Sequence, residues 1–85
     1  MKRYKAKIRI TLRESILDVQ GKTVEKALHS IDFDILSNVR IGKYVEMDVD
    51  AQNDGQAEAF VDDACKKLIA NPIIEDYSIE IEEVE

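Results

Sequence analysis

The sequence predicts an α+β domain, a ferredoxin-like sandwich with two helices on one face of an antiparallel sheet. Two segments, residues 4–12 and 77–82, alternate apolar with charged or polar side chains, which is the period of a half-buried strand. Two others, residues 18–31 and 53–69, repeat apolar side chains every three or four positions, as amphipathic helices do. Two further strands are expected between residues 39 and 49, which gives the order βαββαβ.

The first strand is expected over residues 4–12. Its even positions are Tyr4, Ala6, Ile8, Ile10 and Leu12, and its odd positions are Lys5, Lys7, Arg9 and Thr11. Because successive side chains of a strand point to opposite faces, the even face meets a core and the odd face meets water.

The first helix is expected to start after Asp18, a residue type that caps helix N-termini well. Its apolar stripe consists of Val24, Ala27, Leu28 and Ile31. Gly21 lies in the first turn, where glycine is unfavourable by about 0.5–1 kcal/mol relative to alanine. A close approach of another backbone segment would explain this glycine.

Residues 39–49 keep their apolar side chains at odd positions throughout. A two-residue turn at residues 42–43 would place Glu46 on the apolar face, so the alternation argues against it. Two geometries keep the alternation. One is a hairpin with a three-residue loop at residues 42–44. The other is one long strand without a turn, shared between subunits in a segment-swapped oligomer.

The second helix is expected to start at Asn53, with Gln56 three positions later as a variant of the capping box. Pro72 ends it. The expected stripe of this helix is Ala57, Phe60, Val61, Ala64, Leu68 and Ile69. The last strand places Tyr77, Ile79 and Ile81 on one face and Asp76, Glu80 and Glu82 on the other.

Length and composition predict a single domain over residues 1–85. A chain of this size buries only about 60–65% of the surface that its unfolded form exposes, so association is a natural source of stability. No apolar stretch is long enough to cross a membrane, and the N-terminus does not resemble a signal peptide. The lone cysteine, Cys65, cannot form an internal disulfide, which favours a cytoplasmic location.

The charges are concentrated at the two ends of a chain whose net charge is −6. Six of the twelve basic residues lie within the first thirteen, and six of the eighteen acidic residues lie within the last eleven. One interpretation is a basic arm for nucleic acid. We favour the other, in which the two ends are neighbouring strands whose outer faces pair by opposite charge.

No group of residues predicts chemistry. His29, the only histidine, has no evident nucleophile to activate, and nothing near Cys65 in the sequence would lower the pKa of its thiol. Asp48 and Asp50 share one strand face, but two carboxylates do not make a closed cage for a hard cation. We therefore expect no catalytic, cofactor-binding or metal-binding residues in this chain.

The fold class hosts other activities that leave different marks. RNA-binding modules of this topology carry strand aromatics that stack bases, whereas the segment YVEMDVD at residues 44–50 is acidic with one aromatic. Metal chaperones need two closely spaced cysteines, and this chain has one. A small-molecule-binding regulatory domain of the ACT type leaves only a weak mark, so this alternative stays open.

Four short motifs give the chain a family resemblance. They are Leu17–Asp18 with Gln20–Gly21, Ala27–Leu28–His29–Ser30, VRIGKY at residues 39–44 and LIANPIIEDY at residues 68–77. Over nearly its whole length the chain resembles the PurS family, the small subunits of phosphoribosylformylglycinamidine (FGAM) synthase in de novo purine biosynthesis. It departs from that family at Val19, where a proline is usual, and at Asp32, where a glycine is usual.

The resemblance implies an accessory, non-catalytic role. In this family the small subunit joins a glutaminase subunit, which frees ammonia from glutamine, to a large synthetase subunit, which uses ATP to add that ammonia to formylglycinamide ribonucleotide. The complex uses ATP, magnesium and glutamine, and none is expected to bind this chain. The expected partners are the two larger subunits and further copies of the chain, with no nucleic acid and no membrane.

Two groups of residues at the ends of regular elements are the candidate partner interface. The first patch is Arg40, Gly42, Lys43 and Tyr44, and the second patch is Asn71, Pro72, Glu75, Asp76 and Tyr77. Arginine is enriched at the centres of interfaces and lysine is depleted there. Arg40 is therefore the expected anchor and Lys43 the expected contact at the rim.

Overall fold

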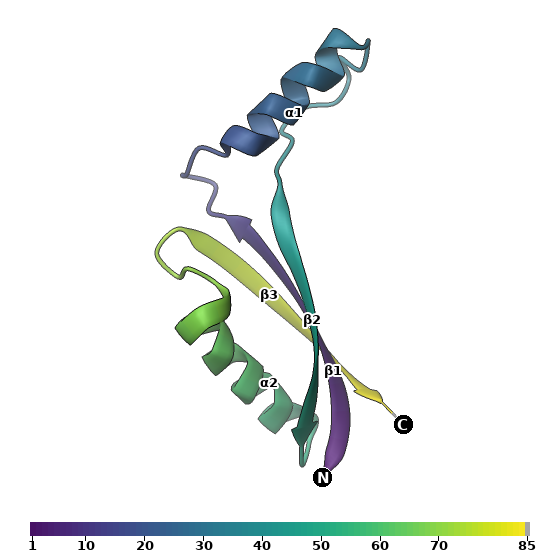
Figure 1. The fold of residues 1–85 in the computed structure, drawn as a ribbon, viewed down its shortest axis with the longest axis vertical. Helices are drawn as coiled ribbons and strands as arrows, with labels where there is room; N and C mark the ends of the chain where they lie inside the picture. The colour runs from purple at the N-terminus through teal and green to yellow at the C-terminus, as the bar shows by residue number, and fades with distance from the viewer. Residues whose placement is uncertain (85) are drawn as a thin grey trace.

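The computed structural model of the chain describes residues 1–84. Its strands are β1 (Lys2–Leu12), β2 (Gly42–Ala51) and β3 (Glu75–Val84). Its helices are α1 (Val19–Ser30) and α2 (Asp54–Ala64), and α2 continues into one π-helical turn, η1 (Cys65–Ile69). The strands form one antiparallel sheet in the order β2-β1-β3 (Figure 1). The predicted α+β class, with an antiparallel sheet and two helices, is confirmed.

The core lies between the sheet and α2. Four even-numbered side chains of the central strand β1 are at most 2% exposed: Tyr4, Ala6, Ile8 and Ile10. Ile8 lies opposite Val45 of β2 and Ile79 of β3, so the apolar faces of the three strands are in register. The helical side of the core consists of Ala57, Val61 and Cys65.

β2 is one unbroken strand of ten residues. It pairs with β1 continuously, from Ala51 opposite Lys2 to Gly42 opposite Thr11. Of the two geometries that the alternation allows, the structure has the one without a turn, so residues 1–84 contribute three strands and not four. Gly42 suits the start of β2 because a Cβ at this position would collide with the carbonyl oxygen of Ile10.

Residues 13–41, which we call the arm, project beyond the end of the sheet (Figure 1). Within the described chain, α1 packs against neither the sheet nor α2. The molecule measures 52 × 29 × 14 Å with a radius of gyration of 16.5 Å, whereas a compact chain of this length would have about 12 Å. Within residues 1–84, only α2 covers the sheet, because the chain leaves the ends of β1 and β2 before α1 forms.

The stripe predicted for the second helix is correct at Ala57 and Val61, which are buried, and wrong at Phe60 and Leu68, which are 51% and 86% exposed. Phe60 lies beside the buried stripe of α2, which is narrow and consists of Ala57 and Val61. Leu68 is displaced by η1, where the N–H of Ala70 bonds to the carbonyl of Cys65, five residues earlier, at 2.9 Å. The extra residue in this turn rotates Leu68 outward.

No helix within residues 1–84 combines the length and hydropathy of a membrane span.

Candidate partner interface

Asp18 joins the arm to the sheet. Its Oδ1 accepts the N–H of Gly21 at 2.9 Å, which caps α1 as predicted, and its Oδ2 accepts the N–H of Ile41 at 2.7 Å. These two donors, with a smaller contribution from the Arg40 charge, hold the pKa of Asp18 below its usual range. The start of α1 and the residues that lead into β2 are thus connected by one carboxylate.

The rest of the arm is held together by contacts between α1 and the segment that returns to the sheet. A Cβ on Gly21 would collide with the carbonyl oxygen of Val39, which is the close approach expected from the sequence. One turn later, Oε1 of Glu25 accepts the N–H of Val39 at 3.1 Å, and this bond lowers the pKa of Glu25. His29 Nε2 lies 2.7 Å from the carbonyl oxygen of Leu36. The arm is therefore a folded unit.

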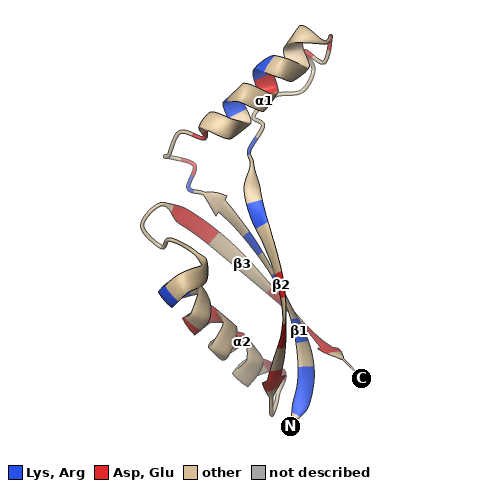
Figure 2. Ribbon diagram, viewed as in Figure 1, with Lys and Arg blue, Asp and Glu red and all other residues tan. Residues whose placement is uncertain are grey.

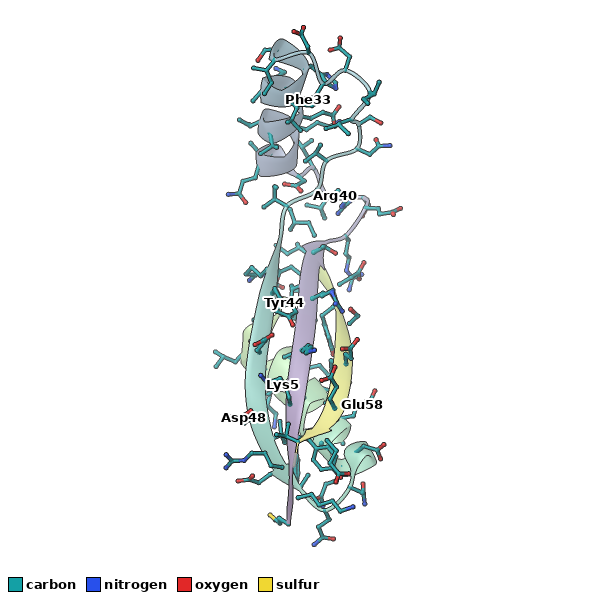
Figure 3. The ribbon with its side chains drawn as sticks, turned by 90° about the vertical axis from the view of Figure 1, so that its right-hand side faces the viewer. Lys5, Phe33, Arg40, Tyr44, Asp48 and Glu58 are labelled. Carbon is teal, nitrogen blue, oxygen red and sulfur yellow. The ribbon has the colours of Figure 1, made fainter. Side chains whose placement is uncertain are left out.

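The arm nevertheless leaves its apolar side chains exposed. The large exposed residues are Ile16, Leu17, Val19, Val24, Ile31, Phe33, Ile35 and Leu36. Figure 3 shows Phe33 on the arm, far from the sheet residues Tyr44 and Asp48. Helical periodicity predicts the stripe of α1 but not the exposure of residues 33–36, whose only signal is the apolar side chains of the run IDFDIL at residues 31–36.

The structure separates the members of the first patch. Arg40 is exposed, and its guanidinium donates to the carbonyl of Leu12 where the arm meets the sheet. Tyr44 lies on the outer face of the sheet, the face opposite α2 (Figure 3). Lys43 precedes it and therefore points to the inner face, where its Nζ lies 3.4 Å from Glu75 Oε2. The Lys43–Glu75 pair connects the first patch to the second.

The second patch comprises residues of the turn between η1 and β3 and the first three residues of β3, and Asn71 organises the turn. The N–H of Asn71 donates to Glu75 Oε1 at 2.7 Å, and Oδ1 of Asn71 accepts the N–H of Ile73 at 3.1 Å. The side chain of Glu75 is only 13% exposed. Asn71 and Pro72 are exposed, whereas Glu75 acts inside the chain.

Arg13 binds the same turn from the other side, because its guanidinium donates to the carbonyl of Pro72 and lies 3.7 Å from Asp76 Oδ1. Tyr77 is not a surface residue of this patch. It packs against the core, and its hydroxyl donates to Asp62 Oδ1 at 2.6 Å, which raises the pKa of Tyr77 to about 12. Asn71, Pro72 and Asp76 are thus the members of the second patch that face outward.

The outer face of the sheet is a ladder of opposite charges. In Figure 2 the N-terminal part of β1 is blue, and red segments lie on β2 and β3. Lys7 Nζ lies 2.9 Å from Glu82 and 3.7 Å from Glu80, and Arg3 Nε lies 3.3 Å from Asp50. The prediction that the two ends of the chain pair as neighbouring strands is confirmed, and the pairing accounts for the basic N-terminus.

Cys65 and His29, the two residues considered for catalysis, lie in the following surroundings. Cys65 is fully buried, and burial raises the pKa of its thiol. The ring nitrogen Nε2 of His29 lies within hydrogen-bond distance of the carbonyl oxygen of Leu36. Among residues 1–84, no three or more His, Cys, Asp and Glu side chains lie together as metal ligands would.

Within residues 1–84, the fold and the arm define a small α+β domain with a large exposed apolar surface. A model of the PurS family, described as phosphoribosylformylglycinamidine (FGAM) synthase, matches residues 5–83. The chain therefore belongs to the PurS family of FGAM synthase subunits.

Relatives support this assignment along the whole chain. The FGAM synthase subunit PurS of Bacillus subtilis (strain 168) is 46% identical over 81 residues, which is 95% of each chain. The same subunit of Synechocystis is 40% identical over 82 residues, 96% of this chain and 82% of that one.

Solved structures agree with the fold. The PurS of Methanocaldococcus jannaschii, one of the subunits of formylglycinamide ribonucleotide amidotransferase in the purine biosynthetic pathway, has a TM-score of 0.87 at 34% identity. This match covers 96% of the present chain and 99% of that one. A chain in the structure of PurLQS from Thermotoga maritima has a TM-score of 0.86 at 31% identity, over 99% and 100% of the two chains.

Proposed function

We propose that this chain is the non-catalytic small subunit of an FGAM synthase. In this role it bridges a glutaminase subunit and an ATP-dependent synthetase subunit and helps ammonia pass between them. The complex would use ATP, magnesium and glutamine, while this chain binds none of them. Membership of the PurS family and the likeness to a chain of the T. maritima PurLQS structure support the proposal.

The observation that carries the proposal is the exposed arm. Ile31 and Ile35 are 61% and 90% exposed although the arm around them is folded by hydrogen bonds. Covering apolar surface yields about 25 cal/mol per Å². A chain of this size has few other sources of stability, so the arm gains most when another protein covers it.

Self-association is part of this proposal. Within residues 1–84, β2 is an edge strand, and Val45, Met47 and Val49 on its inner face are only partly buried. The α1 of a second copy would cover this part of the inner face and complete the two-helix layer of a ferredoxin-like sandwich. Light scattering at micromolar concentration should give at least twice the 9.7 kDa of one chain. A monomer at this concentration would contradict the shared arrangement.

The proposed bridging surface combines the outward members of both patches. They are Arg40 and Tyr44 from the first patch and Asn71, Pro72 and Asp76 from the second. Lys43 stays a rim contact, with its Nζ near Glu75. Ammonia that travels between two active sites needs a route sheltered from water, and a subunit that closes the gap between the larger proteins supplies one.

Co-purification tests the proposal directly. The tagged chain is mixed with purified glutaminase and synthetase subunits, each alone and both together, with ATP, magnesium and glutamine present. A bridging subunit retains both partners in one complex. An ACT-type regulatory domain would instead bind a small metabolite and retain neither protein, and this result would overturn the proposal.

A further inference from the structure

Arg9 is the exception in the charge ladder on the outer face of the sheet. The other basic residues of β1 each lie within 4 Å of a carboxylate: Lys2, Arg3, Lys5 and Lys7. Arg9 is exposed and has no such neighbour among residues 1–84. Among the described residues, its guanidinium is therefore the one basic group on this face that has no carboxylate partner.

The strand register explains this exception. Lys7 lies opposite Glu46 on β2 and Glu80 on β3, whereas Arg9 lies opposite Tyr44 and Ser78, which are both neutral. Acidic residues opposite β1 therefore neutralise its basic side chains only as far as Lys7, the residue before Arg9 on the same face.

The carboxylates nearest to Arg9 in the register are already engaged. Glu46 Oε1 lies 3.9 Å from Lys5 Nζ, and Glu46 Oε2 accepts the hydroxyl of Tyr44 at 2.8 Å. On the other side, Glu80 and Glu82 both lie close to Lys7. A swing of the Arg9 side chain toward these acids would compete with existing pairs.

Arg9 is also held in place. The Cζ atom of its guanidinium lies 5.8 Å from the centroid of the Tyr44 ring, within the range of a cation–π contact. The ring is in turn fixed through its hydroxyl by Glu46. A stacked guanidinium keeps its N–H groups free for a planar acceptor and loses less entropy when it binds one.

We propose that Arg9, stacked on Tyr44, is the docking point for a carboxylate side chain of a partner subunit. This inference rests on the proposed function and names the contact through which one larger subunit would bind the outer face. Bidentate pairing of arginine with carboxylate matches the geometry of both groups. The exposed hydroxyls of Thr11 and Ser78 flank the same site and can donate to the bound oxygens.

The charge of the surroundings favours a protein carboxylate over a free anion. Acidic residues flank β1 on both neighbouring strands, and the chain carries a net charge of −6. A nucleotide or a nucleic acid brings several negative charges into this field. A single carboxylate brings one, and the remainder of a protein interface holds it in position.

The test compares two arginines on the same face of the same strand. Arg9→Ala removes the free guanidinium, and Arg3→Ala, the matched control, removes one that is paired with Asp50 and 59% exposed. Binding of each variant to the purified synthetase and to the purified glutaminase is measured by calorimetry. Arg9→Ala should weaken binding to one of the two subunits about tenfold or more, as truncation of an interface anchor does. Arg3→Ala should change it about twofold or less, as expected of an exposed pair.

Arg9→Lys gives a second measurement. It keeps the charge and the fold but loses the planar fork, so its affinity should fall between those of the wild type and Arg9→Ala. If Arg9→Ala does not fold, the comparison of Arg9→Lys with the wild type tests the inference. Thermal unfolding of each Arg9 variant alone should stay close to that of the wild type, because Arg9 has no ion pair within the described chain to lose and its contact with Tyr44 is exposed.

The outcomes are separable. If the wild type binds neither subunit, both the proposed function and this inference are overturned. If the wild type binds and Arg9→Ala binds equally well, only the inference is overturned. Tight binding of inorganic phosphate or ATP to the isolated chain, lost in Arg9→Ala, would also overturn it, because the site would then belong to a small anion.

Discussion

The carboxylate of Asp18 accepts the backbone N–H of Ile41 at 2.7 Å across 23 positions of the chain. Its other oxygen accepts the N–H of Gly21 at the start of α1. Both ends of the arm therefore meet at one side chain where the arm leaves the sheet. This side chain therefore ties the start of α1 to the segment that leads into β2.

Replacing Asp18 should loosen the arm without unfolding the sheet. In Asp18→Ala the amides of Gly21 and Ile41 lose their acceptor, so their hydrogen exchange should accelerate about tenfold or more. The amides of β1 and β3 should keep their protection. Asp34→Ala, a substitution at an exposed acid of the same arm, is the matched control and should leave all these rates unchanged. Uniform acceleration in Asp18→Ala would show that the arm and the sheet are one cooperative unit.

The same contact predicts a pH dependence. The pKa of Asp18 is lowered in the folded chain by its bonds from Gly21 and Ile41. A group with a depressed pKa contributes stability above its unfolded pKa, about 3.9 for aspartate, and loses it as the pH falls through the folded value. Exchange at Ile41, corrected for the intrinsic rate, should therefore be constant from neutral pH to about pH 4 and accelerate below it. In Asp18→Asn this acceleration should be much smaller, and the remainder is expected from Glu25, whose pKa is also lowered by its bond from Val39.

Val19→Pro should stabilise the chain. Val19 is the first residue of α1, the position where proline is favoured because its N–H has no partner inside the helix and its fixed φ suits the turn. Asp18 before it has φ −93° and ψ 94°, an extended conformation that a following proline tolerates. The gain in free energy of unfolding should be about 0.4–1 kcal/mol, measured by urea denaturation. A loss of stability would show that the loop before α1 follows another path.

Asp32→Gly should also stabilise the chain. Asp32 has φ 75°, a left-handed conformation that costs most residues about 1–2 kcal/mol and costs glycine almost nothing. Part of this gain is offset by the greater freedom of glycine in the unfolded chain, so a net gain of about 0.5 kcal/mol is expected in the same denaturation experiment. Ser30→Gly, two residues earlier in α1, should destabilise instead and serves as the control.

The sheet and the caps could be predicted because local residue types determine them. The alternation of β1 identified its buried face, and Asp18 and Asn53 cap their helices as expected. The direction of the arm could not be predicted, because period-two alternation in residues 39–49 is the same for a hairpin and for a straight strand. Only the pairing of β2 with β1 along its full length decides between them.

The composition of the candidate interface was harder to predict. Glu75 and Tyr77 lie at the start of β3, where exposed contact residues are expected, yet their side chains form hydrogen bonds with Asn71 and Asp62 inside the chain. The neutral neighbours of Arg9 could not be predicted either, because they depend on the register of β1 with β2 and β3. The π-helical turn that exposes Leu68 has no sequence signal in this chain that we can identify.

Arg40→Ala should affect the coupling of the complex more than the fold. Arg40 is exposed, and its one hydrogen bond within residues 1–84 goes to the carbonyl of Leu12. In the reconstituted complex, glutamine-dependent synthesis should fall about tenfold, as expected for an interface anchor, while synthesis from added ammonium should be spared. Lys67→Ala, at an exposed base on η1, is the control and should change neither rate. An equal loss of both rates would place Arg40 outside the coupling of the two sites.

The central claim is that this chain couples two larger subunits and performs no chemistry itself. The most direct measurement is FGAM synthesis by the purified glutaminase and synthetase subunits, with and without this chain, from glutamine and separately from an ammonium salt. The account predicts that glutamine-dependent synthesis requires the chain, and that ammonium-dependent synthesis by the synthetase proceeds without it. Glutamine-dependent synthesis at an undiminished rate in the absence of the chain would contradict the account.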